Sequence, residues 1–183
     1  MEHWLLADLQ VKECLNGAWM GHDRDERAPS IMECIMRFNE LTAWLTTEIL
    51  LKDTAKERAQ MIGRIIHIGE LLLDLQNFSG VMSVCAALQG ASVYRLKKSW
   101  ALVKKKHMAA FERLMTVIKR DGNSKAYRSL LHSCNPPCVP YLGIYLTDLT
   151  FISDGNPERL PENEELTNWT RLSGIAAVVM EIK

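Results

Sequence analysis

Residues 54–75 read TAKERAQMIGRIIHIGELLLDL and decide the class of fold. The pattern Thr54-x-x-Glu57 predicts a capping box, in which a hydroxyl and a carboxylate satisfy backbone N–H groups at the start of a helix. The apolar residues that follow would cover more than one side of this helix: Met61, Ile62, Ile65, Ile66, Ile68, Leu72 and Leu75. Such a broad apolar face is typical of a helix at the centre of a bundle.

The segments around this central helix repeat the helical pattern. Residues 30–51 open with a second predicted capping box, Ser30-x-x-Glu33, and carry apolar side chains every three or four positions. The further helical patterns cover residues 81–88, 100–119, 124–134 and 164–183. Prolines and turn residues bound them, including turns predicted at residues 77–80 and 121–123. Residues 141–152 fit a strand and a short buried helix equally well. We predict one all-α domain over residues 1–183.

The composition argues against several classes of protein. The 183 residues are 48% hydrophobic and carry 22 basic and 22 acidic side chains, so the overall charge does not favour binding to nucleic acid. No apolar stretch reaches the ~20 residues that cross a bilayer, and the odd number of 5 cysteines argues against an oxidised, secreted framework. We expect a cytoplasmic protein. It would reach the inner membrane surface indirectly, through a partner or further domains, unless its basic segment binds there.

Motifs for metals, nucleotides and covalent catalysis are weak. His132, Cys134 and Cys138 offer three metal ligands, but a zinc site needs a fourth, and two prolines lie between the cysteines. No cysteine lies in a known protease signature, and neither common glycine-rich phosphate loop is present. We expect no metal and no cofactor, so any nucleotide chemistry would belong to the site of a partner.

Positive charge is concentrated between residues 92 and 132. This segment has eleven lysines and arginines, against only Glu112 and Asp121. Ordinary solvated helix faces explain such a segment, and so does a surface that meets an acidic protein or an anionic membrane.

The last predicted helix has two unlike sides. At about 100° per residue, one side would carry Trp169, Leu172, Ile175, Ala176, Val179 and Ile182. The opposite side would carry Thr170, Gly174, Ala177 and Glu181, so that a carboxylate stands among small side chains that another molecule can approach closely. An ordinary solvent-facing helix side is the alternative interpretation.

Several longer motifs follow one another along nearly the whole chain. They are RAPSI at 27–31, RFN at 37–39, WLTTEI at 44–49, NF at 77–78, SVYRLKKSW at 92–100, YR at 127–128, NPPCVPYLGIYLTDLTF at 135–151 and DGNP at 154–157. In this order they resemble the catalytic domain of the Ras-family guanine-nucleotide exchange factors, and the long proline-containing run is the most specific of them. The resemblance implies an all-helical domain that binds a small GTPase of Ras, Rap or Ral type and loosens its GDP and magnesium without covalent chemistry.

In this family a helical wedge displaces one switch region of the GTPase. The resemblance places the wedge at residues 168–182, with Glu181 at its acidic position, Ala177 beside it and Gly174 as a further contact. A carboxylate there would compete with phosphate for magnesium and repel the bound anion.

A hydrophobic groove of the family grips the second switch region. Arg64 matches a basic residue that meets this switch, and the resemblance adds Met61 and Tyr127 as GTPase contacts, for which a role inside the helical core is the alternative.

Compared with the family, the chain begins after the opening helix and lacks the C-terminal helices that brace the wedge. The resemblance therefore implies an incomplete domain. An exchange factor is the leading interpretation, and a non-exchanging helical module that still binds a GTPase or another protein is the alternative. A third interpretation is a fragment too incomplete to fold stably.

Overall fold

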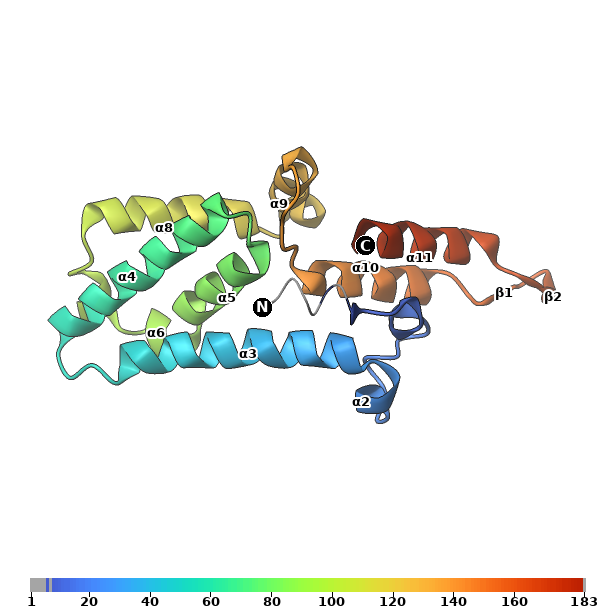
Figure 1. The fold of residues 1–183 in the computed structure, drawn as a ribbon, viewed down its shortest axis with the longest axis horizontal. Helices are drawn as coiled ribbons and strands as arrows, with labels where there is room; N and C mark the ends of the chain where they lie inside the picture. Colours follow the sequence, from blue (N-terminus) through green and yellow to red (C-terminus); the bar gives the residue numbers. More distant parts are fainter. Residues whose placement is uncertain (1–5, 7, 183) are drawn as a thin grey trace. The chain divides into compact units, whose positions relative to one another are not determined.

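A computed structural model of the chain describes residue 6 and residues 8–182 (Figure 1). This part of the chain consists of helices and one short two-stranded sheet, which confirms the all-α prediction. It divides into two compact units, the first formed by residues 1–37 with 141–183 and the second by residues 38–140. Helix α3, Pro29–Leu50, continues across the division. That residues 1–183 form a single domain stays a prediction.

The second unit is organised around α4, Ala55–Asp74, as the sequence predicts. This helix packs against α5 (Phe78–Gln89), α7 (Lys97–Trp100) and α8 (Lys105–Ile118). Aliphatic side chains of these helices form the core together with Ile49 of α3, including Ile62, Ile65, Ile66, Val84, Leu88 and Leu114. At Gly69 a Cβ atom would lie 2.7 Å from Leu114 Cδ1 and 3.0 Å from Val84 Cγ1, so the missing side chain permits the close approach of three helices.

The predicted capping box at the start of α4 is confirmed. The backbone N–H of Glu57 donates to Thr54 Oγ1 at 3.2 Å, and the backbone N–H of Thr54 donates to Glu57 Oε2 at 3.0 Å. The hydrogen bond from the Thr54 hydroxyl is the main reason why the pKa of the Glu57 carboxyl is lowered. Both residues are therefore engaged in starting the helix.

The predicted turn at residues 77–80 is the start of α5. The Asn77 side chain accepts a hydrogen bond from the Gly80 N–H at 2.9 Å and so caps the helix. Val139 fixes this start from a distant part of the sequence, because its carbonyl accepts from the Phe78 N–H at 2.9 Å and its N–H donates to the Gln76 carbonyl at 2.9 Å. The proline-containing segment thus holds the connection between α4 and α5.

Turns divide the rest of the second unit more finely than the sequence predicts. The prediction of one helix over residues 100–119 is wrong at its start, because a turn separates α7 from α8. This turn is anchored by the buried Val103, and the Trp100 Nε1–H donates to the carbonyl of Val93 in α6 (Ala91–Tyr94) at 3.0 Å. The break at residues 121–123 is confirmed: α9 (Asp121–Ser133) begins with left-handed backbone at 122–124.

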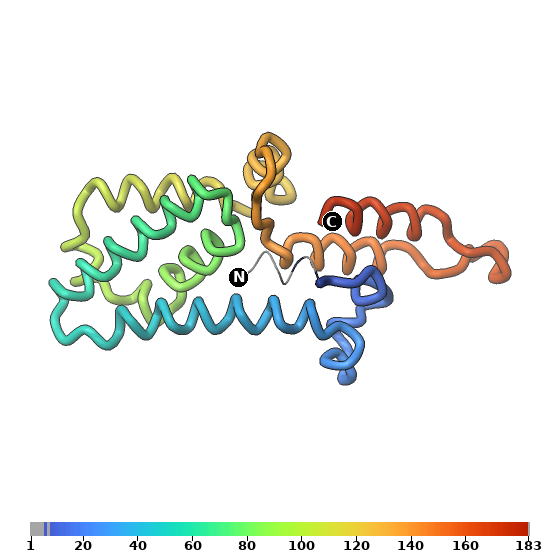
Figure 2. The backbone as a smooth tube through the Cα atoms, viewed as in Figure 1, coloured from blue at the N-terminus to red at the C-terminus, as the bar shows by residue number. Residues whose placement is uncertain are grey.

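The first unit pairs two helices through a hairpin, which Figure 2 shows as a continuous backbone. Helix α10, Leu142–Gly155, resolves the ambiguous stretch, and α11, Trp169–Ile182, packs against it. Between them, β1 (Arg159–Leu160) and β2 (Asn163–Thr167) form an antiparallel pair. The prediction of helix from residue 164 is therefore wrong, because residues 161–162 form the turn of this hairpin and residues 163–167 continue as a strand. At the start of β2, Asn163 Oδ1 accepts from the Glu165 N–H at 3.0 Å.

The start of α3 corrects the second predicted capping box. The helix begins at Pro29, a residue whose fixed φ suits the first helical position, so Ser30 lies inside the helix. The cap comes instead from Glu13, a buried residue of the short helix η1 (Val11–Cys14). Its Oε2 accepts from the N–H groups of Ser30 at 2.8 Å and Ile31 at 3.3 Å, and its Oε1 accepts from Gln10 at 3.1 Å. One carboxylate thereby joins η1 to α3.

The remaining helix, α2 (Arg24–Arg27), is a single turn before α3. Within the described residues, no helix is both long enough and apolar enough to cross a membrane.

Burial should protect one cysteine of the second unit from thiol reagents. Cys85 is fully buried in α5, and desolvation raises the pKa of its thiol to about 12. Because only the thiolate reacts with a disulfide reagent, we expect Cys85 of the folded chain to stay unlabelled at neutral pH. Thiol titration should show the same number of fast-reacting groups in the Cys85→Ala variant. Loss of one fast-reacting group would contradict the buried position.

Candidate functional site

The orientation of α11 is set by polar contacts at its first turn. The Asn168 side chain accepts from the Arg171 N–H at 3.3 Å and donates to the Pro157 carbonyl at 3.0 Å. The Arg171 guanidinium Nη1 donates to the carbonyls of Ser153 at 3.0 Å and Asn156 at 2.9 Å, at the C-terminal end of α10. A cation at this end of a helix is favourable, because the last carbonyl groups lack partners there.

These contacts turn α11 away from the predicted orientation. The buried side is formed by Ile175, Val178, Val179 and Ile182. Trp169, Leu172 and Ala176, which the sequence placed on this side, are exposed. Gly174 was predicted on the opposite side, yet it faces α10, since a Cβ there would lie 3.4 Å from Ile152 Cδ1. The position of Gly174 therefore does not support a direct GTPase contact.

The exposed side of α11 combines small and large apolar residues with one carboxylate. Ala177 and Glu181 are both exposed and lie one helical turn apart, as the sequence predicts. Met180, next to Glu181, is 79% exposed, and Trp169 stands at the start of the same helix. Large apolar side chains that gather on a surface are typical of an interaction site. We call this side the α11 face, defined by Trp169, Leu172, Ala176, Ala177, Met180 and Glu181.

A second exposed apolar surface lies on α4, in the other unit. Ile68, Leu71 and Leu75 are exposed, with Leu75 at 72%, and they follow Arg64 at intervals of three and four residues. Residues at this spacing are neighbours on one side of a helix. We call these four residues the α4 stripe.

The α4 stripe corrects the predicted core, which included Ile68 and Leu75. The buried side of α4 consists of Ala59, Ile62, Gly63, Ile65, Ile66 and Gly69, so Ile68 and Leu75 lie outside it. The sequence contains one signal for this exposed surface. Positions 64, 68, 71 and 75 repeat at helical spacing and so form a second stripe beside the buried side of α4.

The three predicted contacts of the second unit have different environments. Arg64 is exposed at the surface, as a contact residue requires. Met61 is half-buried and packs against the core. Tyr127 is only 1% exposed, and its ring meets the Phe78 ring edge-on with centroids 5.5 Å apart. The packing of Tyr127 therefore favours the alternative, a role inside the helical core, and its assignment as a GTPase contact stays a prediction.

Arg64 also borders a basic hollow of about 450 Å³ between α4 and the start of α8. Its lining contains no acidic side chain and consists of Lys56, Ala59, Gln60, Gly63, Arg64, His67, Leu102, Lys104 and His107. The pKa of His107 is lowered, first by burial and then by the charge of Lys106. Glu70 lies nearby and pairs with Arg113, and more loosely with His67, at 3.7 Å from Nδ1. The charged side chains that line the hollow are thus all basic.

The weak metal motif gains no support. Among the residues that the structure describes, no three His, Cys, Asp or Glu side chains come together in a way that would hold a metal ion. Burial is the main cause of a raised pKa at the Cys138 thiol, with Cys134 adding to it.

Comparison with known proteins identifies the family. Residues 1–173 match the family model described as RasGEF domain. The chain is 34% identical over 183 residues to Ras-specific guanine nucleotide-releasing factor 2 of Danio rerio, and 40% identical over 153 residues to Ras guanine nucleotide exchange factor E of Dictyostelium discoideum. The matches cover 100% and 82% of this chain but only 14% and 15% of those proteins. The chain thus spans about one seventh of these relatives and belongs to the RasGEF domain family.

Proposed function

We propose that this chain promotes GDP release from a small GTPase of the Ras family, of Ras, Rap or Ral type. The observation that carries the proposal is the match of residues 1–173 to the RasGEF domain. The names of the relatives, which are guanine nucleotide exchange or releasing factors, support the same activity. No covalent chemistry is needed, because exchange is a change in binding equilibrium.

The α11 face serves as the wedge in this proposal. Ala177 leaves room for a close approach of the GTPase to the helix, and Glu181 brings a negative charge to the phosphate and magnesium site. A carboxylate about 4 Å from a phosphate charge raises the free energy of bound nucleotide by roughly 1–4 kcal/mol, according to solvent exposure. By linkage, a protein that prefers the empty GTPase must weaken nucleotide binding by the same free energy.

The α4 stripe provides the second contact. Its three exposed aliphatic side chains supply the apolar surface and Arg64 supplies a charge for recognition. An apolar side chain that becomes fully buried on binding contributes roughly 1.5–3 kcal/mol. Binding at the stripe would supply the affinity that holds the GTPase while the α11 face disturbs the nucleotide.

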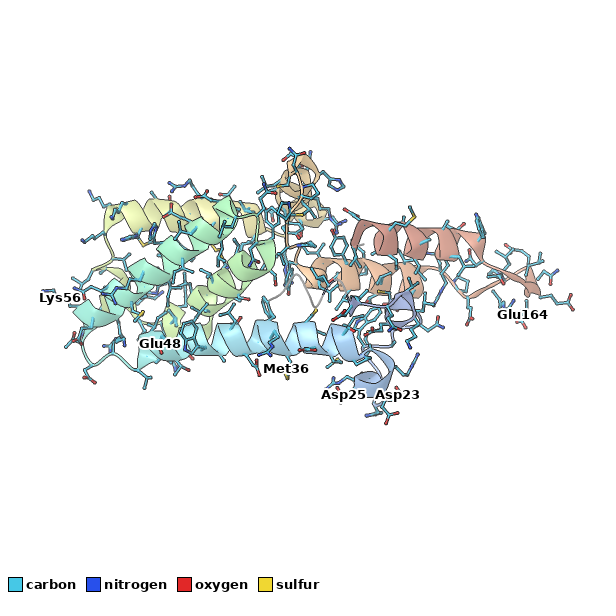
Figure 3. All side chains as sticks on the ribbon, viewed as in Figure 1. Asp23, Asp25, Met36, Glu48, Lys56 and Glu164 are labelled. Atoms are coloured by element: carbon cyan, nitrogen blue, oxygen red, sulfur yellow. The ribbon has the colours of Figure 1, made fainter. Side chains whose placement is uncertain are left out.

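The test is the release of fluorescent GDP from Ras-, Rap- and Ral-type GTPases with and without the chain. We expect acceleration for at least one GTPase. Leu71→Glu should reduce the rate at low chain concentration by about tenfold or more, because it places a charge in the middle of the α4 stripe. Met36→Glu is the matched control, since Met36 on α3 is 49% exposed and Leu71 is 48% exposed (Figure 3 labels Met36).

Two results would count against the proposal in different ways. If a folded chain accelerates release from none of the GTPases but still binds one of them, the non-exchanging binding module replaces the exchange factor. If both variants lose activity equally, the exchange factor stands and the α4 stripe is not its contact surface.

A further inference from the structure

Lysines gather at one end of the second unit. Lys56 lies in the first turn of α4, Lys104 is the N-cap residue of α8, and Lys105 and Lys106 begin that helix. All four are exposed, and Lys56 and Lys104 line the same hollow. Figure 1 shows the N-terminal ends of α4 and α8 together at this end of the unit, where Figure 3 labels Lys56. We call these four lysines the basic end.

The position of these lysines is unfavourable for the helix that carries them. The N-terminal end of a helix has positive partial charge, so cations there reduce its stability. In α8 no acidic residue lies in the first turn, and no side chain caps the helix. The three lysines therefore do not serve the stability of α8, and their charges remain available to an anionic partner.

The carboxylates near the basic end neutralise it only in part. Glu57 is engaged with Thr54 in the capping box, and Glu48 lies 3.8 Å from Lys52. Asp53 is an exposed carboxylate in the connection before α4. The basic end keeps a net positive charge against them.

The kind of basic residue favours a lipid surface over an acidic protein. Arg58, the arginine at this end, points inward: its Nη1 donates to the carbonyls of Lys52 at 2.7 Å and Asp53 at 3.2 Å, and its Nε donates to Ser99 Oγ at 3.2 Å. The exposed Arg64 also lines the hollow, but it lies about two helical turns further along α4 than Lys56. The four outward charges of the basic end are on lysines, a residue type that is depleted in protein interfaces, where arginine is enriched. A bilayer attracts such flexible point charges without requiring a fixed geometry.

Exposed leucines stand beside the lysines. Leu102 is 56% exposed in the turn before α8, where it lines the hollow with Lys56 and Lys104. Leu51 is 68% exposed in the connection between α3 and α4. Apolar side chains next to basic ones are typical of surfaces that enter the headgroup region of a membrane.

We propose that the basic end binds the surface of an anionic phospholipid bilayer, with the lysines next to the headgroups and Leu102 at the interface. This direct contact goes beyond nucleotide exchange and does not depend on it.

The test is sedimentation of the 183-residue chain with vesicles made of equal parts phosphatidylcholine and phosphatidylserine. The triple variant Lys104→Ala, Lys105→Ala, Lys106→Ala should bind about 100-fold more weakly, since each lysine contributes roughly fivefold. This variant should remain folded, because it relieves the unfavourable start of α8.

A variant with the same loss of charge elsewhere in the unit is the matched control. Lys119→Ala, Arg120→Ala, Lys125→Ala removes three exposed charges beyond the other end of α8, about 20 Å away along its 14 residues. This distance is about twice the Debye length at ~0.1 M salt, so binding should change little. Leu102→Ser should weaken binding by a smaller factor, because it removes only the apolar contact.

Three results would overturn the proposal. Equal binding to vesicles of pure phosphatidylcholine would exclude charge recognition, and equal losses in both triple variants would exclude the basic end as the site. Binding to polyglutamate without binding to the anionic vesicles would identify an acidic protein as the partner instead. No GTPase is present in these assays, so their failure is distinct from failure of the exchange activity.

Discussion

Glu181→Ala is expected to slow GDP release from the responsive GTPase about ten- to a hundredfold at a saturating concentration of the chain. The loss corresponds to roughly 1.4–3 kcal/mol of electrostatic repulsion that the carboxylate exerts on nucleotide and metal at the partner's site. Because the side chain is exposed on α11, its removal should leave the stability of the chain within about 0.5 kcal/mol. Release of fluorescent GDP and a urea unfolding curve measure the two quantities.

The charge of Glu181 can be separated from its shape. Glu181→Gln keeps the size of the side chain and should lose nearly as much activity as the alanine variant. Glu164→Ala removes an exposed carboxylate from β2 in the same unit and should have no effect. If Glu181→Gln releases GDP at the normal rate, the position acts by contact rather than by charge, and the electrostatic part of the mechanism is wrong.

Glu13→Ala is expected to lower the free energy of unfolding of the chain by about 2–4 kcal/mol. The buried carboxylate accepts hydrogen bonds from three backbone N–H groups, two of them at the start of α3. A buried donor left without a partner costs roughly 1–3 kcal/mol, and a lost helix cap costs about 1 kcal/mol. Urea unfolding followed by circular dichroism measures the difference from the midpoint and slope of the curve.

Glu33→Ala is the control for this substitution, because the sequence pattern assigns the capping role to that residue. Glu33 is exposed within α3, so the structure predicts a change below about 0.5 kcal/mol. If Glu33→Ala lowered the free energy of unfolding more than Glu13→Ala, Ser30 and Glu33 would form the true cap, and α3 would begin after Pro29.

The two capping predictions show what local sequence can determine. The box of Thr54 and Glu57 involves residues three positions apart, so the pattern contains every group that takes part, and the prediction is confirmed. Glu13 lies 17 positions before Ser30, and no local pattern reports that contact. Periodicity similarly located α4 but could not separate a strand from a helix in α10, where aliphatic and aromatic residues cover all sides.

The candidate site was predictable in its chemistry rather than in its geometry. Motif order supplied Arg64, Ala177 and Glu181, and all three are exposed. The periodicity of α11 misplaced Gly174, because contacts of Arg171 with residues of α10 decide how the helix is rotated. Tyr127 has a phenol ring suited to either a surface or a core, and only its packing against Phe78 decides between them.

The contacts of Arg171 also have a mechanical consequence. Rotation of α11 about its own axis would pull the guanidinium away from the two carbonyl groups of α10 that it holds at 3.0 and 2.9 Å. These hydrogen bonds therefore resist rotation of the helix at its first turn, where Asn168 also donates to the Pro157 carbonyl. A force that a bound partner exerts on Ala177 or Glu181 is therefore transmitted to α10 through these contacts.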